Sequence, residues 1–308
     1  MIEYSYSRIH LYEQCPAAYK YNYILKTEKI VPTYFLKGLI AHKIMEQYGL
    51  TKDVQSAVEN TIEEYGSYEL TMNILEELRP LLNDLFFKNA KYFEYDLHFE
   101  VSDDIDTKYF IGVIDRIDID QYNNYEIIDY KYSNTTYQTE SIPKSIQPIL
   151  YALGAFTTFN IDKVKFTYIN LKKKETTSYV FRRGDINIRY IISLVNSIEN
   201  ATKENNFPAK PGDYCVYCQF SYTCPAFKKY IQSNVLTEET DIDSLVENYV
   251  EMKKKINIEN KLFKKLDNII KSYMRYNKIE ILENNKYKLI MNNESISIIE
   301  KMKNEVEE

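Results

Sequence analysis

The sequence has no uninterrupted apolar run of about 20 residues, the length that a membrane-spanning helix needs. Its beginning, MIEYSYSRIH, lacks the basic and then apolar pattern of a signal peptide. It also has no internal repeat and no low-complexity linker. These absences argue against a membrane-spanning or repeat protein. They predict a soluble protein of the cytoplasm, either bacterial or, if viral, in the host cell.

A general excess of basic charge is missing as well. The net charge is −6, which is not typical of a nucleic-acid-binding protein. The charge is uneven, however: residues 61–106 hold twelve acidic and three basic side chains, whereas residues 138–234 hold thirteen basic and seven acidic ones. A basic, tyrosine-bearing surface suits a phosphate backbone, although a solvated hairpin tip fits the pattern equally well. The candidate DNA contacts in this region are Lys172, Lys173, Lys174, Arg182 and Arg183.

Cysteine is scarce, and its four positions form a pattern. Cys215, Cys218 and Cys224 have C-x2-C-x5-C spacing, and Cys15 lies near the beginning of the chain. In a cytosolic protein this set favours a metal site over a disulfide framework. Zinc ribbons usually pair two C-x2-C knuckles and only one is present, so the set favours a [4Fe–4S] cluster over Zn²⁺. Four unlinked buried thiols are the structural alternative.

The stretch GVIDRIDIDQYNNYEIIDYKYS, residues 112–133, predicts a β-hairpin whose strands carry acidic residues. Asp129 and Lys131 are two residues apart and therefore point to the same face of their strand. Asp115 can reach the same place from the neighbouring strand. The structural interpretation is an ion pair at the surface of the sheet. The functional one is a site for Mg²⁺ or Mn²⁺, which prefer oxygen ligands, beside a catalytic lysine.

The remaining periodicities predict a mixed α/β sheet flanked by helices. Helical patterns cover residues 5–26, 36–50, two stretches within 53–92, 142–158 and 184–205. Strand patterns cover residues 94–101, 110–119, 125–133, 163–171 and 176–183. We expect one domain over residues 1–234, with a helical subregion at about 50–92. A charged, mostly helical extension would follow over residues 235–308, most simply a pair of solvated helices with a short strand near its end.

Several of these strings occur in an order that resembles a known family. They are SYSRIHLYEQCPAAYKYNYI, GLIAHKIMEQY, GVIDRID, IIDYKYS, QPILYALG and CVYCQFSYTC. Together they resemble the RecB-type nucleases of the PD-(D/E)XK superfamily. The most similar subset carries an iron–sulfur cluster and includes CRISPR-associated exonucleases, the AddB-type nuclease domain and phage exonucleases. The resemblance covers about residues 4–228 and implies a restriction-endonuclease-like fold.

The resemblance also implies a role for each matching residue. His42, Asp115 and Asp129 would bind the metal, and Lys131 would be the catalytic lysine. Gln147 would position the nucleophile, and Tyr151 would contact the DNA backbone. The four cysteines would be the cluster ligands.

These residues predict a Mg²⁺- or Mn²⁺-dependent deoxyribonuclease. Single-stranded DNA or DNA ends would be the substrate, in repair, recombination, or phage or CRISPR processing with a helicase or CRISPR-type partner. One alternative is a non-catalytic iron–sulfur scaffold that binds DNA within a helicase–nuclease or integration complex. Another is a zinc-containing restriction endonuclease with sequence specificity.

Overall fold

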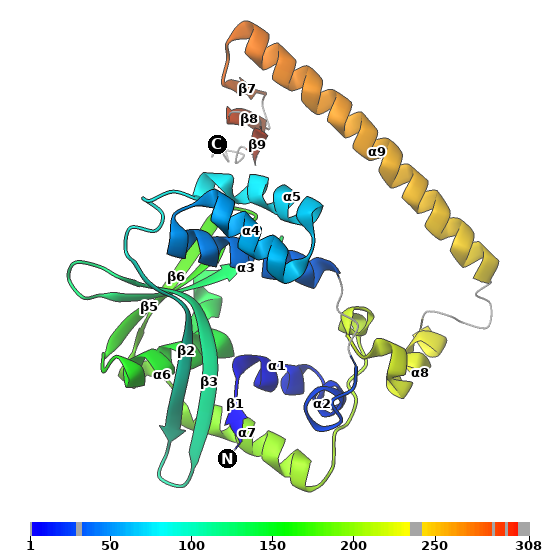
Figure 1. The fold of residues 1–308 in the computed structure, drawn as a ribbon. Helices are drawn as coiled ribbons and strands as arrows, with labels where there is room; N and C mark the ends of the chain where they lie inside the picture. Colours follow the sequence, from blue (N-terminus) through cyan, green and yellow to red (C-terminus); the bar gives the residue numbers. More distant parts are fainter. Residues whose placement is uncertain (1, 29–32, 235–241, 285–286, 293–294, 301–308) are drawn as a thin grey trace, which may run out of the picture. The chain divides into compact units, whose positions relative to one another are not determined.

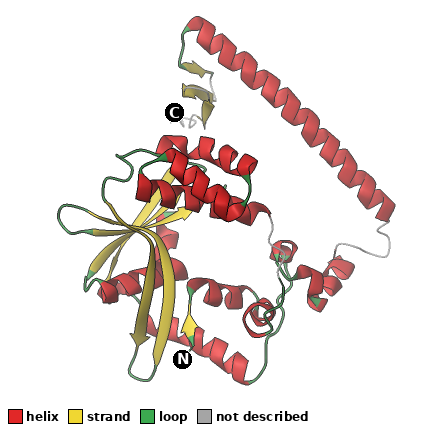
Figure 2. Cartoon of the chain, viewed as in Figure 1, coloured by secondary structure: helices red, strands yellow, loops and turns green. Residues whose placement is uncertain are grey.

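The computed structural model describes residues 2–28, 33–234, 242–284, 287–292 and 295–300. The chain divides into two compact units, Met1–Tyr230 and Ile231–Glu308 (Figures 1 and 2). Among the described residues, no helix is both long and apolar enough to cross a membrane.

A mixed six-stranded sheet forms the centre of the first unit. Its strands are β1 (Glu3–Tyr4), β2 (Ala90–Ser102), β3 (Thr107–Ile119), β4 (Tyr125–Lys131), β5 (Lys163–Asn170) and β6 (Glu175–Arg182). They run in the order β1-β3-β4-β5-β6, and β2 also pairs with β3. The β1–β3 and β4–β5 pairs are parallel and the others antiparallel. The predicted mixed α/β fold is therefore confirmed.

Helices cover both faces of this sheet (Figure 1). The helices before residue 235 are α1 (Tyr6–Gln14), α2 (Pro16–Tyr19), α3 (Thr33–Thr51), α4 (Val54–Tyr65), α5 (Tyr68–Leu78), α6 (Ile146–Thr158), α7 (Ile188–Lys203) and α8 (Pro225–Asn234). Among the described residues, α8 makes no extensive contact with the sheet. Neighbouring residues of β4 point to opposite sides, because strand side chains alternate. Ile127 joins the core under α6 and α7, whereas Ile128 joins the core under α3, α4 and α5.

Two predicted helices have different limits in the structure. The second helix of the 53–92 stretch ends at Leu78, and Pro80 lies in a 3₁₀ turn that follows. Proline cannot supply the backbone N–H that a helix interior needs, so the helix does not continue past this point. The strand β2 then begins at Ala90, within the stretch predicted to be helical. Likewise, Pro143 lies in a 3₁₀ segment, Thr139–Lys144, and α6 begins only at Ile146.

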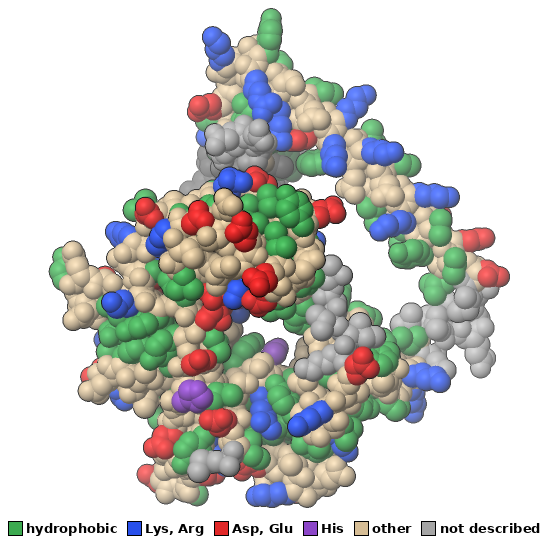
Figure 3. All heavy atoms as spheres, in the orientation of Figure 1, with side chains coloured by type: hydrophobic (Ala, Val, Ile, Leu, Met, Phe, Trp, Pro, Cys, Tyr) green, Lys and Arg blue, Asp and Glu red, His purple; other side chains and the backbone are tan. Residues whose placement is uncertain are grey.

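The N-terminal helical stretch is broken at Cys15 and Pro16. Ser5 caps α1, and its hydroxyl accepts a hydrogen bond from the backbone N–H of Arg8. Cys15 has an extended backbone and separates α1 from α2, of which Pro16 is the first residue. The break places the cysteine at a corner between the two helices. Figure 3 shows acidic side chains gathered over α4 and α5, while other acidic residues of the 61–106 stretch lie on β2 and the turn after it.

The second unit corrects the expected pair of helices. After the end of α8, the described residues of this unit form one long helix, α9 (Ile242–Asn277), and a small sheet of β7 (Ile281–Glu283), β8 (Tyr287–Asn292) and β9 (Ser295–Glu300). Both strand pairs of this sheet are antiparallel. The short strand expected near the end of the chain corresponds to β8, and its neighbours were not predicted.

Candidate active site

Two carboxylates come together where the pairing of β3 with β4 stops. Arg116 and Ile128 are the last paired residues of this hairpin, and Asp115 lies one residue beyond, beside Asp129. The backbone N–H of Tyr130 donates to Asp115 Oδ2 at 2.6 Å. This bond fixes the Asp115 carboxylate against the edge of β4.

Helix α6 adds an amide that links the second carboxylate to the lysine. Asp129 is only 2% exposed, and its Oδ2 lies 2.6 Å from Lys131 Nζ. Gln147 Nε2 donates to Asp129 Oδ1 at 2.6 Å, and Gln147 Oε1 accepts from Lys131 Nζ at 3.0 Å. The helix can lie this close to the sheet because Gly154 has no side chain: a Cβ there would lie 2.8 Å from Leu97.

Helix α3 contributes the fifth member of the site. His42 Nδ1 lies 3.4 Å from Asp115 Oδ1. We call these residues the polar cluster: His42, Asp115, Asp129, Lys131 and Gln147. The structure thus brings together every residue that the sequence assigned to metal binding or catalysis in this part of the fold.

The groups of the polar cluster shift one another's pKa values. Burial raises the pKa of Asp129 to about 6, and nearby Asp115 adds to the shift while Lys131 opposes it. Burial alone would lower the pKa of Lys131, but Asp129 outweighs it and the pKa is raised. Burial likewise opposes protonation of His42, and Asp115 raises its pKa overall. Asp129 and His42 therefore bind protons more tightly than such groups do in water, and a cation bound at these two side chains would compete with those protons.

The donor set of the polar cluster fits a hard divalent cation. Carboxylates are the ligand type that Mg²⁺ and Mn²⁺ prefer, and the imidazole adds a nitrogen donor beside them. Asp129 Oδ2 receives no well-directed hydrogen bond from any described residue. As they stand, no three His, Cys, Asp or Glu side chains of the described residues are arranged as a finished metal site. Cation binding would therefore require side-chain adjustment within the cluster.

Glu94 of β2 belongs to this neighbourhood and was missed from the sequence. It lies between Phe93 and Tyr95, whose partners Arg116 and Ile114 flank Asp115 on β3. Partial burial raises its pKa to about 7, and nearby Asp115 adds to the shift. Its backbone has φ of 45°, which is uncommon for a non-glycine residue and unusual inside a strand. An acidic residue at the start of a predicted strand was the only signal in the sequence.

A pocket of about 610 Å³ opens beside Lys131 and Gln147. Its wall includes Tyr6 and His10 of α1, whose rings stack with centroids 5.3 Å apart. Further lining residues are Tyr137, Lys144, Tyr168 and Tyr190. The volume lies in the range of small-molecule sites, and the lining combines aromatic rings with a cationic side chain.

The predicted DNA contacts fall in different places. Tyr151 is 9% exposed, and its hydroxyl donates to the backbone oxygen of Val113 at 2.7 Å. Its ring packs on Gly112, where a Cβ would come within 3.0 Å. Tyr151 therefore braces α6 against β3, and part of it lines a pocket that it shares with Gln147.

The five basic residues separate into two groups. Lys172, Lys173 and Lys174 are exposed in the turn after β5, next to the end of β4, because Leu171 N–H donates to Lys131 O at 2.8 Å. Arg182 and Arg183 lie at the opposite end of the β5–β6 hairpin. There the Arg183 guanidinium donates to Asp162 at 3.0 Å and to Phe156 O at 2.7 Å. Only the lysine turn adjoins the polar cluster.

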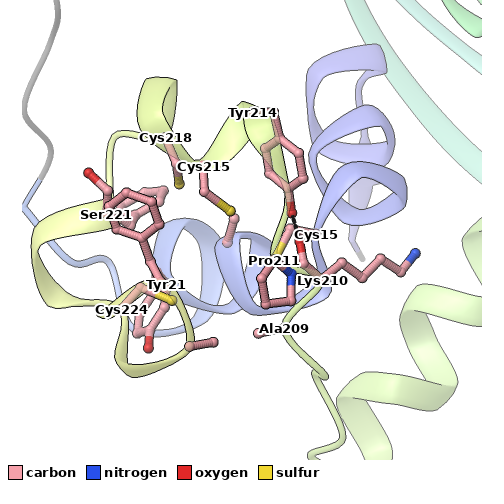
Figure 4. Close-up of a pocket in the computed structure, with 14 residues that line it drawn as sticks. Cys15, Tyr21, Ala209, Lys210, Pro211, Tyr214, Cys215, Cys218, Ser221 and Cys224 are labelled. Carbon is pink, nitrogen blue, oxygen red and sulfur yellow. Dashed lines mark hydrogen bonds between the residues drawn. The ribbon is translucent and has the colours of Figure 1, made fainter. Parts of the chain in front are cut away.

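The four cysteines line one pocket of the first unit, although one of them lies about two hundred residues from the others in the sequence. Figure 4 shows their sulfur atoms around this pocket, between α1–α2 and the C-terminal segment. We call this set the thiol pocket: Cys15, Cys215, Cys218 and Cys224. All four are free thiols.

The thiols lie close enough to influence one another. Burial raises the pKa of Cys218, and the neighbouring cysteines raise it further. Burial also acts to raise the pKa of Cys15, but hydrogen bonds from the backbone of Lys210 and from Tyr214 outweigh it and the pKa is lowered. The pocket therefore makes the Cys15 thiol more acidic than an ordinary cysteine, because its pKa is lowered.

Comparison with known proteins gives one family. The family model described as "PD-(D/E)XK nuclease superfamily" matches residues 3–225. No curated protein matches the chain. One matching solved structure is titled "Crystal structure of SSO0001"; its identity is 14%, its TM-score 0.37, and the match covers 73% of this chain and 86% of that one.

Proposed function

The chain belongs to the PD-(D/E)XK nuclease superfamily, and we propose that it is a Mg²⁺- or Mn²⁺-dependent nuclease that degrades single-stranded DNA or DNA ends. The observation that carries this proposal is the polar cluster, in which Asp129, Lys131 and Gln147 are joined by short contacts and the Asp115 carboxylate lies 3.4 Å from His42. Repair, recombination, and phage or CRISPR processing are its proposed settings, with a helicase or CRISPR-type protein as partner.

His42, Asp115 and Asp129 would hold the divalent cation. When bound, the ion would polarise a phosphoryl oxygen and lower the pKa of a coordinated water. Asp115 stays oriented by its bond from Tyr130 N–H. The proton on His42 would leave on binding, because a ligand imidazole must be neutral.

Lys131 and Gln147 would act on the substrate side of the cluster. The Lys131 ammonium keeps its proton, because its pKa is raised, and can stabilise the negative charge that develops on phosphorus-bound oxygens. The side-chain amide of Gln147 contacts both this ammonium and the Asp129 carboxylate, and so holds the two groups in place. The side-chain amide of Gln147 would orient Lys131 and would also restrict the positions that a nearby water molecule can take.

The preference for unpaired DNA rests on the pocket beside Lys131. Its stacked Tyr6 and His10 rings resemble the platforms on which unpaired bases stack. Lys144 in the same wall supplies positive charge for a phosphate. A base within a duplex cannot reach such a wall without leaving its stack.

We also propose that the thiol pocket holds a [4Fe–4S] cluster in a structural role. Zinc ribbons usually pair two C-x2-C knuckles, whereas this chain has one such knuckle, a five-residue step to Cys224 and the distant Cys15. Four thiols spaced around a pocket are better matched to a larger cluster. It would tie α1 and α2 to residues 213–224 and close a long loop.

The test of the function compares the wild type with Asp129→Asn, both purified without oxygen. The substrates are end-labelled single- and double-stranded DNA with Mn²⁺ or Mg²⁺. We expect the wild type to degrade single strands faster, EDTA to stop the reaction, and the variant to lose activity by about 10³-fold. Cleavage retained by the variant would contradict the site. DNA binding without cleavage by the wild type would favour the scaffold alternative.

A further inference from the structure

Helix α9 of the second unit exposes large apolar side chains along its whole length. Tyr249, Met252 and Phe263 have 68%, 66% and 65% of their surface open. Leu245, Ile256, Leu266 and Tyr273 are each about half exposed. Figure 3 shows hydrophobic side chains projecting at intervals along this helix. An apolar row of this kind marks an interaction surface.

The row follows a heptad spacing. One series of positions, spaced seven residues apart, is Tyr249, Ile256, Phe263 and Ile270. A second series lies four residues before each of these and consists of Leu245, Met252, Glu259 and Leu266; seven residues further on it reaches Tyr273. Eight of these nine positions are apolar. A heptad sustained over about four repeats predicts a two-helix coiled coil. We call these nine positions the α9 seam.

The charges of α9 select the partner and its direction. Residues 242–252 hold three acidic and no basic side chains, whereas residues 261–275 hold five basic and one acidic. A parallel neighbour of the same sequence would place like charges side by side. An antiparallel neighbour places the acidic end of one helix along the basic end of the other. We propose that α9 pairs with the α9 of a second copy of this chain in an antiparallel coiled coil.

The seam also fixes the register of this pair. When Leu245 packs against the partner's Ile270, Tyr249 meets the partner's Leu266. Met252 then meets the partner's Phe263, and the reverse contacts follow from the twofold symmetry. Every apolar position of the seam meets an apolar partner except Ile256, which faces the partner's Glu259, and Tyr273, which lies at the end of the overlap.

The single polar position of the seam agrees with this register. Glu259 lies opposite the partner's Lys255 and Ile256, near the twofold axis. Within one chain Lys255 pairs with Glu251 at 2.9 Å, and both side chains are more than half exposed, so this contact is weak and easily exchanged. A lone polar residue in an apolar seam specifies alignment at some cost in stability. Glu259 would have that role here.

Light scattering of the full chain after gel filtration tests the pairing. We expect the wild type to have twice the chain mass of 36.6 kDa. The double variant Met252→Lys/Phe263→Lys puts charges into the α9 seam and should run as a monomer. The matched control Asn257→Lys/Asn268→Lys adds the same charge outside the seam and should remain a dimer. Circular dichroism would confirm that all variants keep their helix content.

Two results would overturn the pairing: a wild type that is monomeric at every concentration, or a dimer that the seam variant leaves intact. The direction is tested separately with a spin label on a non-canonical residue at position 247. The antiparallel register puts the two labels roughly 30 Å apart along the axis, at 1.5 Å rise per residue, whereas a parallel pair puts them within about 20 Å. The shorter distance would overturn the antiparallel arrangement.

Discussion

The polar cluster and the thiol pocket are both groups of potential metal ligands, but different forces hold them in place. In the polar cluster, side chains of α3, β3, β4 and α6 contact one another directly, as the Lys131–Gln147 and Gln147–Asp129 bonds show. In the thiol pocket the cysteines are free, and hydrogen bonds such as that from Gly212 N–H to Cys215 Sγ at 3.3 Å join them to the surrounding chain.

This difference indicates which of the two sites can form without its metal. Hydrogen bonds and ion pairs already orient the polar cluster, and a sheet with covered faces supports it. The thiol pocket lies outside the main cores, where Cys15 and Phe220 belong to a small separate cluster. We therefore expect damage to the polar cluster to remove activity but spare the fold. Damage to the thiol pocket should affect the fold itself.

The largest effect should come from Lys131→Met. Loss of the ammonium removes charge stabilisation in the transition state and should lower kcat by about 10² to 10³-fold. The melting temperature should change little, because the stem of the side chain remains. Lys165→Met on the neighbouring strand, where Lys165 pairs with Glu126 at 3.0 Å, is the control and should keep full activity. A Lys131 variant within threefold of wild type would disprove the assigned role.

Cys218→Ser tests the other half of this comparison, the expected effect of the thiol pocket on the fold. If a cluster joins the two ends of the first unit, the variant loses iron and sulfide, and its melting temperature falls by about 10 °C or more. Ser221→Ala in the same pocket should keep both. Elemental analysis and thermal melts give the answer. Zinc in place of iron in the wild type would reject the [4Fe–4S] proposal, and a fully stable variant without metal would reject the structural role.

The pH dependence of cation binding sharpens the contrast further. Asp129, with a pKa raised to about 6, and His42, with a raised pKa, must both lose protons before they can bind a cation. Affinity for Mn²⁺ should therefore rise with pH, about tenfold per unit for each proton released, and level off above both pKa values. Calorimetric titrations between pH 5 and 8 measure this. Equal affinity at pH 5.5 and 7.5 would be inconsistent with the assigned ligands.

The same pKa shifts of Asp129 and His42 have the opposite effect on the stability of the metal-free protein, which they lower as the pH rises. The folded protein holds these protons more tightly than the unfolded chain does. Their contribution is fully present below the unfolded pKa values and is lost as the pH rises through the folded ones. Chemical denaturation of the metal-free protein should thus show this contribution decreasing between pH 5 and 8.

The smallest effect should come from Glu94→Gln. At pH 8 the Glu94 carboxylate is mostly ionised, since its pKa is about 7, and it adds negative charge near Asp115. Removing it should weaken Mn²⁺ binding a few-fold at pH 8 and hardly at all at pH 6. Glu100, at the far end of the same strand opposite Tyr109, supplies the control variant Glu100→Gln. A loss of the same size at both pH values would show that charge is not the cause.

Local periodicity of the sequence determined much of this protein. The two-residue period of strands places Asp129 and Lys131 on one face, and the short polar turn at residues 120–124 brings Asp115 alongside. The pairing of Arg116 with Asp118, at 2.5 Å, also follows from that period. Such features depend on neighbours within a hairpin, where backbone geometry leaves few choices.

Packing between distant segments decided the rest. The close approach of α6 at Gly154 sets the bonds of Gln147, and β2 brings Glu94 next to Asp115. The same hairpin geometry carries Lys172 toward the polar cluster and Arg182 away from it, although the two are ten residues apart. Sequence patterns specify the face on which a side chain lies. Distances between faces arise only when several elements share one core, because each contact depends on how all of them pack.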